Sequence, residues 1–316
     1  MPGVDLLKLV LALMVVGIHA NPFVILGRPV QLATGEGLYR LAVPVFLIFN
    51  GYFLQGAITA GRGWGYVRRA LQLYVIWMLI YLPVAWPLWA SLDLWPTIRM
   101  AIFGYWHLWY LSALAMAASA AVLLRDWSSA GLLRLAGGLF AAALVLLAVM
   151  SAGLWKPWPV IFTDPLPPLR NAVVMGLPFL LLGVVIRREG LAARWPRQTV
   201  LWACGAALLL VLVESWTLAA ISVRPQSHDL MASLILAAPL LAIAALQWPP
   251  RFEAGAMGAY SSGIYFLHVI FVSLLLRHTE IKQWGYGSAP VWVIAVIGSV
   301  ALTWGIRRSR LDRWLL

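Results

Sequence analysis

The most constraining feature of this sequence is a series of apolar runs, each long enough to cross a bilayer as a helix. About 20 predominantly apolar residues span the hydrocarbon core of a membrane. Only 11% of the residues are charged and 63% are hydrophobic, so the chain cannot supply the polar surface of a soluble domain. We therefore expect an all-α, polytopic transmembrane helical bundle with about ten spans, at approximately 4–22, 38–58, 69–89, 107–124, 132–152, 170–187, 199–217, 229–247, 260–277 and 288–307.

The loops between these runs are short, which predicts one transmembrane domain over residues 1–316. When the loops are assigned alternately to two sides, more arginines and lysines fall on the side that holds both termini. The positive-inside rule then predicts that both termini lie in the cytoplasm. The N-terminal sequence MPGVD lacks the basic region and cleavage site of a signal peptide, so the first span is expected to be retained.

Charge and motif content exclude several classes of protein. The net charge is +12, but the basic residues are scattered between apolar runs and form no nucleic-acid face. The single cysteine, Cys204, excludes a disulfide framework, and the five histidines show no metal-ligand spacing. There is no Walker loop, Rossmann glycine pattern or GxSxG elbow. We expect the lipid bilayer as a partner, and neither a nucleic acid nor a metal.

The first span carries three ionisable residues, which are costly inside a membrane and usually mark a site. Lys8 and His19 are eleven residues apart, so they share one helix face and are separated by about 16 Å along the axis. Asp5 lies one turn before Lys8. The alternatives are that Asp5 and Lys8 pair at the inner surface, and that His19 is a hydrogen-bonded structural histidine.

Other polar residues are expected at the depth of His19. Arg40, His107 and Asp229 begin spans at that level, and Glu214 lies within the apolar run of another. The alternative is that each of the three span-end residues only lies at the membrane–water interface: Arg40, His107 and Asp229. If these side chains lie close together in the fold, they could form an acid–base site. A carboxylate would orient a histidine base, and an arginine would stabilise negative charge. On the inner side, Arg62, Arg68 and Arg69 could bind phosphate or serve as topological charge, and Arg69 is the best candidate for a site.

Four sequence motifs resemble those of the acyltransferase 3 family of membrane acyltransferases. VDLLKLVLALMVVGIHA resembles the first span of that family, with a basic residue and a histidine at the positions of Lys8 and His19. YRLAVPVFLIFNGYFL (39–54) resembles its second span. HLWYLSAL (107–114) and YSSGIYFLHVIF (260–271) resemble two further motifs, in the family's order. Two departures are that Gln72 stands where many members have a second arginine of the third span, and that no fused extracellular domain is present.

The resemblance implies a membrane O-acetyltransferase that moves an acyl group, usually acetyl, from cytoplasmic acyl-coenzyme A to a hydroxyl of a carbohydrate or lipid-linked glycan. It also implies a bacterial inner-membrane location. We expect His19 to act as general base, with an acyl-histidine intermediate as the less favoured variant. Glu214 would orient His19 or contact the acceptor, and Arg40 or His107 would stabilise the oxyanion. Lys8, Asp5 and Arg69 are assigned to coenzyme A, and the expected substrate-binding residues are Asn50, Trp109, Tyr110, Tyr265 and His268.

Two alternatives stay open at this point. A transporter or flippase for a lipid-linked glycan or small metabolite would also use many spans and a polar stripe. A membrane acyltransferase that acts on lipid or protein would differ only in its acceptor. For the preferred function the acceptor could be a cell-envelope polysaccharide, a lipid-linked sugar, peptidoglycan or a small metabolite.

Overall fold

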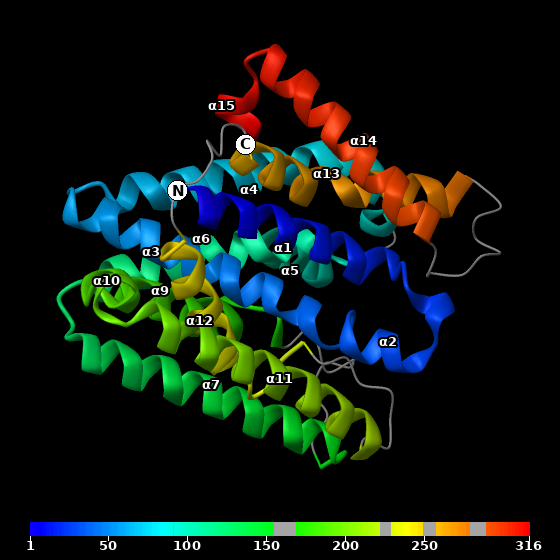
Figure 1. Ribbon diagram of the computed structural model, residues 1–316. Coiled ribbons are helices and arrows are strands. Elements are labelled where there is room, and N and C mark those ends of the chain that lie inside the picture. Colours follow the sequence, from blue (N-terminus) through cyan, green and yellow to red (C-terminus); the bar gives the residue numbers. More distant parts are fainter. Residues whose placement is uncertain (91, 155–168, 222–228, 249–256, 279–288) are drawn as a thin grey trace.

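The protein folds into a bundle of helices (Figure 1). The computed structural model describes residues 1–316 apart from 91, 155–168, 222–228, 249–256 and 279–288. Within the described ranges every regular element is helical, so the expected all-α bundle is confirmed. Eight helical segments there are long and apolar enough to cross a membrane. They are α1 (Pro2–Ala20), Arg28–Thr59 with α3 (Ala42–Thr59), α4 (Gly63–Trp89), Trp106–Leu123 with α6 (Trp109–Leu123), α7 (Ser129–Ser151), α11 (Arg197–Ile221), α13 (Met257–His278) and α14 (Ala289–Arg308).

Two of the expected spans take a shorter form. In the range 170–187, the π-helical turn η4 (Ala172–Gly176) leads into α9 (Leu177–Arg188). In the range 229–247, the helix α12 covers only Leu234–Leu246. Smaller helices connect the long ones: η1 (Val24–Leu26), α2 (Arg28–Ala33), η2 (Leu38–Leu41), α5 (Leu94–Phe103), η3 (Trp106–Leu108), α10 (Leu191–Arg194) and α15 (Asp312–Leu315).

Helices α3 and α9 pack closely against each other, and two glycines make this possible. A Cβ added at Gly51 on α3 would lie 1.9 Å from the carbonyl oxygen of Leu180. One added at Gly183 on α9 would lie 2.0 Å from the carbonyl oxygen of Ile48. Small residues let helix backbones approach closely in membranes, where packing and not the hydrophobic effect drives helix association. The two helices therefore pack backbone against backbone.

Helix α1 is held by helices from the far end of the sequence. The Ser261 hydroxyl of α13 donates to the Lys8 carbonyl at 2.8 Å, and the Trp292 indole of α14 donates to the Leu13 carbonyl at 3.2 Å. Both chain termini lie at the same end of the bundle, which we call the terminal end (Figure 1). Helix α1 runs away from it, so His19 lies toward the opposite end. Which side of the membrane each end faces stays a prediction.

Candidate functional site

A cavity of about 360 Å³ lies at the end of the bundle opposite the termini. Its polar lining comes from six separate stretches of the chain: the end of α1, η2, η3, the segments that precede η4 and α12, and α13. The polar and ionisable side chains that line it include His19, Arg40, His107, Arg170, Asp229 and Tyr265, and Trp106 and Trp109 add indole rings. The structure therefore brings together His19, Arg40 and His107, which the sequence predicted to share one level.

His19 is delivered to the cavity by the last turn of α1. Asn21 ends this helix in the left-handed conformation, with φ of 42°, and its backbone N–H donates to the Gly17 carbonyl. Asparagine tolerates that conformation better than most residues, which explains why the helix stops at Ala20, one residue beyond His19. The ring centroid of His19 lies 5.2 Å from that of His268 on α13.

His268 is fully buried behind the cavity wall. Its Nδ1 lies 2.8 Å from the Tyr265 carbonyl and 3.1 Å from the Ile264 carbonyl. Because a carbonyl only accepts, Nδ1 carries the proton and Nε2 is the free acceptor of the neutral ring. Nε2 is buried and has no hydrogen-bond partner among the described residues. The His107 ring centroid lies 5.1 Å away, so His268 sits between the two histidines that line the cavity.

His107 is presented by a tight turn. Gly104 has φ of 81°, and a Cβ there would lie 2.9 Å from the backbone of Leu108, so glycine is required. Trp106 also has a positive φ, 50°, which is rare for a bulky side chain and marks local strain of the kind that gathers at functional sites. The Tyr265 hydroxyl donates to the His107 carbonyl at 2.7 Å. Both ring nitrogens of His107 are buried without a hydrogen-bond partner in the described part of the chain.

An ion-pair cluster forms the charged wall of the cavity. Arg40 donates through Nη1 to one carboxylate oxygen of Asp229, and Arg170 donates through Nε to the other. The side chains of Arg40 and Asp229 are only 12% and 9% exposed. Two guanidinium groups and one carboxylate leave a net positive charge, and Nε of Arg40 is buried without a partner among the described residues. The wall is therefore suited to an anionic group or a developing oxyanion.

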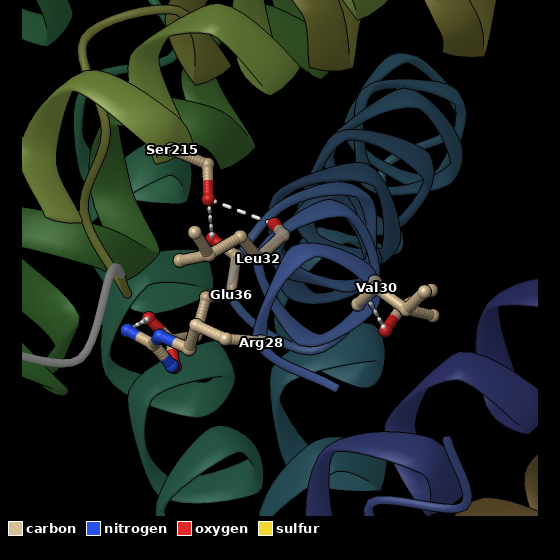
Figure 2. Close-up of polar contacts among 6 residues, drawn as sticks. Arg28, Val30, Leu32, Glu36 and Ser215 are labelled. Carbon is tan, nitrogen blue, oxygen red and sulfur yellow. Dashed lines mark hydrogen bonds and ion pairs between the residues drawn. The ribbon is translucent and has the colours of Figure 1, made fainter. Parts of the chain in front are cut away.

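The segment that carries Arg40 is fastened to α11 by a buried serine. The Ser215 hydroxyl lies 2.8 Å from the Leu32 carbonyl and 3.1 Å from the Glu36 carbonyl, as Figure 2 shows. An ion pair between Arg28 and Glu36 closes the same loop (Figure 2). These contacts hold the backbone that leads into η2, and η2 places Arg40 at the cavity.

The structure places Glu214 away from the cavity, in contrast to the role expected from the sequence. Its two carboxylate oxygens accept hydrogen bonds from the backbone N–H groups of Ala232 and Ser233, each at 2.7 Å. Ser233 caps α12, so the carboxylate satisfies backbone donors at the start of that helix. Among the described residues, the acid that lines the cavity is Asp229. Neither Asp229 nor Arg170 was selected as a site residue, although both were visible as charges at the ends of apolar runs.

Lys8 on α1 lies toward the terminal end and packs against two aromatic rings of α3. The Lys8 ammonium lies 4.7 Å from the ring centroid of Phe53 and 5.8 Å from that of Phe49, a cation–π arrangement. Asp5 binds the N-terminal ammonium at 3.0 Å. A direct Asp5–Lys8 ion pair, the alternative raised by the sequence, is not among the ion pairs of the described residues.

Asn50 on α3 joins two tyrosines through hydrogen bonds. The Asn50 amide donates to the Tyr110 hydroxyl at 2.7 Å and accepts from the Tyr66 hydroxyl at 2.5 Å. Tyr110 in turn lies with its ring centroid 5.4 Å from that of Tyr265 at the cavity. Of the expected substrate-binding residues, Trp109 and Tyr265 line the cavity, whereas Asn50, Tyr110 and His268 lie behind it.

Arg69 lies near the terminal end, and the structure joins it to the end of the chain. Its Nη1 lies 3.4 Å from the Trp314 carbonyl, and the nearby Trp77 indole donates to the Leu315 carbonyl at 3.0 Å. Arg69 is therefore at the end of the bundle where α1 begins. Among the described residues no group of three or more His, Cys, Asp or Glu side chains could hold a metal ion.

Comparison with known proteins identifies the chain. A family described as an acyltransferase domain matches residues 1–308, which is nearly the whole sequence. With its apolar helices, this match defines the class of protein, an integral membrane acyltransferase. The chain belongs to the acyltransferase 3 family.

Two curated relatives are similar to this chain over different lengths. A serine/alanine racemase of Enterococcus gallinarum is 25% identical over 95% of the chain and 45% of its own length. An amino-acid racemase of Enterococcus faecalis is 27% identical over 35% of the chain and 18% of its own length. The chain thus spans less than half of either relative. No solved structure matches it.

Proposed function

We propose that this protein transfers an acyl group, acetyl in the simplest case, from acyl-coenzyme A to a hydroxyl of a carbohydrate acceptor. The observation that carries the proposal is that His19 and Arg40 face one cavity, with Lys8 on the same face of α1 toward the terminal end. An imidazole can serve as general base for the attacking hydroxyl, and a guanidinium at the same cavity can stabilise the oxyanion that acyl transfer from a thioester forms.

In the proposed reaction the unprotonated nitrogen of His19 removes the proton of the acceptor hydroxyl. The hydroxyl oxygen then attacks the thioester carbonyl, and the negative charge of the tetrahedral intermediate is stabilised by Arg40. The C–S bond breaks, the ester forms, and the thiolate of coenzyme A takes the proton from His19. His268 supports this role because its fixed ring limits the positions available to His19.

Coenzyme A is proposed to enter from the terminal end. Lys8 and Arg69 supply cations there for its phosphates, which charge-assisted hydrogen bonds would hold. Lys8 and His19 are about 16 Å apart along one face of α1, which suits the length of a pantetheine arm. Asn50, Tyr66 and Tyr110 offer hydrogen-bonding groups along the way. The location proposed is a bacterial inner membrane, with the terminal end in the cytoplasm.

The proposal is tested first by ligand binding. Micromolar coenzyme A or acetyl-coenzyme A should raise the unfolding temperature of the detergent-purified protein, because a ligand that binds only the folded state stabilises it. A transporter or flippase would move its substrate without cleaving a thioester, so absence of this shift would favour the transport alternative.

The second test is a comparison of envelope glycans by mass spectrometry. Cells that express the wild-type chain should show an added acetyl mass that is lost in His19→Ala. The matched control is Val10→Ala, because Val10 lies on the same helix with an exposed side chain. Normal acetylation by a folded His19→Ala protein would overturn the assignment of His19.

A further inference from the structure

A second cavity of about 730 Å³ lies beside the cavity that holds His19 and Arg40. We call it the lateral chamber, and α5, α6, α7 and η4 each contribute to its lining. Trp106, Trp109 and Arg170 line both cavities, so the two spaces share one wall. The lateral chamber is therefore the space next to the proposed reacting groups.

The lateral chamber is lined mainly by apolar side chains. Its volume lies in the range of ligand-binding pockets. Arg170 donates to Asp229, and Arg99 also has an interaction partner in the fold, so neither charge calls for an anionic occupant. The lining suits a neutral hydrocarbon group, because beyond the shared tryptophans it includes Met100, Phe103, Met116, Leu146, Val173 and Val174.

The wall between the two cavities is built by the tight turn that precedes α6. Gly104 and Trp106 both line the lateral chamber, and their φ angles are 81° and 50°. The Trp106 ring packs edge-on against the rings of Tyr105 and Tyr81, with centroid distances of 5.3 and 6.0 Å. A bulky residue keeps a positive φ only where the surrounding structure imposes it. The fold, and not a ligand, therefore sets the position of this indole.

The far side of the lateral chamber reaches the outer surface of the bundle. Three apolar residues of its lining, Phe103, Met116 and Val173, are 43%, 38% and 54% exposed. Met116 belongs to a helix that is long and apolar enough to span the membrane, so its exposed face meets lipid hydrocarbon. A hydrocarbon chain that fills the lateral chamber therefore meets lipid, and not water, at its far end.

We infer that the lateral chamber holds the hydrocarbon chain of the acyl donor, and that the group transferred is a medium-chain acyl group such as octanoyl. The thioester carbonyl lies at His19 and Arg40, as in the proposed reaction, and coenzyme A lies toward Lys8. The chain points the other way, past Trp106 and Trp109. An acetyl group would end at its methyl carbon and leave the lateral chamber without an occupant. This inference rests on the proposed function, since it identifies the acyl group that the thioester carries.

The first test measures how affinity changes with chain length. The full-length protein, reconstituted in phosphatidylcholine nanodiscs, is titrated with acetyl-, butyryl-, hexanoyl- and octanoyl-coenzyme A, and empty nanodiscs correct for partition into lipid. Burial of each added methylene should tighten binding roughly four-fold. Two buried methylenes therefore suffice for octanoyl-coenzyme A to bind about ten-fold more tightly than acetyl-coenzyme A, or better. Equal dissociation constants along the series would overturn the inference.

The second test locates the chain. An octanoyl-coenzyme A probe with a photoreactive diazirine near its terminal carbon should label peptides of α5, α6, α7 or η4. Saturating acetyl-coenzyme A should abolish the labelling, because the two thioesters compete for the same coenzyme A site. A label that persists would show that the chain enters from the bilayer as any lipid does. That result, or a label on other helices, would contradict the inference.

Two variants with matched controls narrow the lateral chamber from different helices. Leu146→Trp on α7 and Met100→Trp on α5 should each weaken octanoyl-coenzyme A binding roughly four-fold or more, the equivalent of one methylene. Neither should change acetyl-coenzyme A binding. The controls are Val145→Trp and Ile98→Trp, which are 63% and 39% exposed on the same helices and do not line the lateral chamber. Unfolding temperature without ligand identifies a variant that has not folded, and the other variant then carries the test.

The same titrations separate this inference from the proposed function. Binding of acetyl-coenzyme A as tightly as octanoyl-coenzyme A, or octanoyl-coenzyme A binding that no folded chamber variant weakens, would overturn the inference alone. The proposed function would then stand with acetyl as the group transferred. Failure of the wild type to bind any of the four thioesters would overturn both.

Discussion

The ring of His19 lies 5.2 Å from the ring of His268, centroid to centroid, with an angle of 43° between their planes. His268 is fixed by two backbone carbonyls on its own helix, so its orientation does not depend on a ligand. His19 has the cavity on one side and this fixed ring on the other. His268 is therefore a positioning residue for the proposed base.

Replacement of His268 by Phe tests this role while it keeps a ring of similar size. We expect kcat to fall about 10- to 100-fold, because small displacements of a reacting group cost rate, with little change in the KM for acetyl-coenzyme A. Steady-state kinetics measures both constants. A merely structural role would lower the unfolding temperature and leave kcat of the folded fraction unchanged, so that pattern would contradict the prediction.

Asp229→Ala should destabilise the protein, because it leaves Arg40 buried without its carboxylate. Removing one partner of a buried ion pair costs about 3–5 kcal/mol of the free energy of unfolding. Thermal unfolding in detergent measures the loss. Arg40→Gln combined with Asp229→Asn should recover part of it, since that pair carries no uncompensated charge. An unchanged unfolding temperature in Asp229→Ala would show that the ion-pair cluster does not stabilise the folded protein.

Glu214→Gln tests whether the carboxylate of Glu214 has a structural or a catalytic role. The backbone N–H groups of Ala232 and Ser233 would keep only one good acceptor, which should reduce the free energy of unfolding by about 1–3 kcal/mol. We expect kcat of the folded protein to stay near that of the wild type. A loss of activity of about a thousand-fold without a change in unfolding temperature would return Glu214 to the catalytic site.

Gly183→Val should disrupt the pairing of α3 and α9, since the added Cβ would lie 2.0 Å from the Ile48 carbonyl oxygen. Loss of the folded state, seen as aggregation in size-exclusion chromatography, is the expected result. Gly138→Ala on α7 is the matched control, because no atom outside its own helix turn lies within 4 Å of the added Cβ. That change should be neutral or stabilise by about 0.5–1 kcal/mol, as Ala does in a helix interior. Equal behaviour of the two variants would refute the close-packing explanation.

The apolar runs predicted most of the fold, because the cost of unsatisfied backbone groups in lipid leaves few structures besides helices. The range 229–247 shows the limit of this reasoning. Hydropathy predicts one continuous span there, whereas α12 begins at Leu234. The residues before it leave the helix, and this lets Asp229 meet Arg40 and Arg170. Hydropathy reports only how apolar a segment is. It therefore cannot locate the start of a helix when a tertiary ion pair sets that start.

The site was predicted in part for a similar reason. Helical spacing and the alternation of spans placed His19, Arg40 and His107 at one depth, and the structure joins them at one cavity. Their catalytic roles stay predictions. The sequence could not distinguish Glu214 from Asp229, because both are acids near the ends of apolar runs. Only the rotation of each helix and the course of the connecting segments decide which carboxylate faces the cavity.

The contacts of α1 with α13 and α14 have a consequence for biosynthesis. Helix α1 is completed by hydrogen bonds from Ser261 and Trp292, which follow their α1 partners by 253 and 279 positions in the sequence. His19 cannot meet His268 until α13 has been made. A nascent chain that has not yet reached α13 therefore lacks the contact between His19 and His268, and so does a chain truncated before α13.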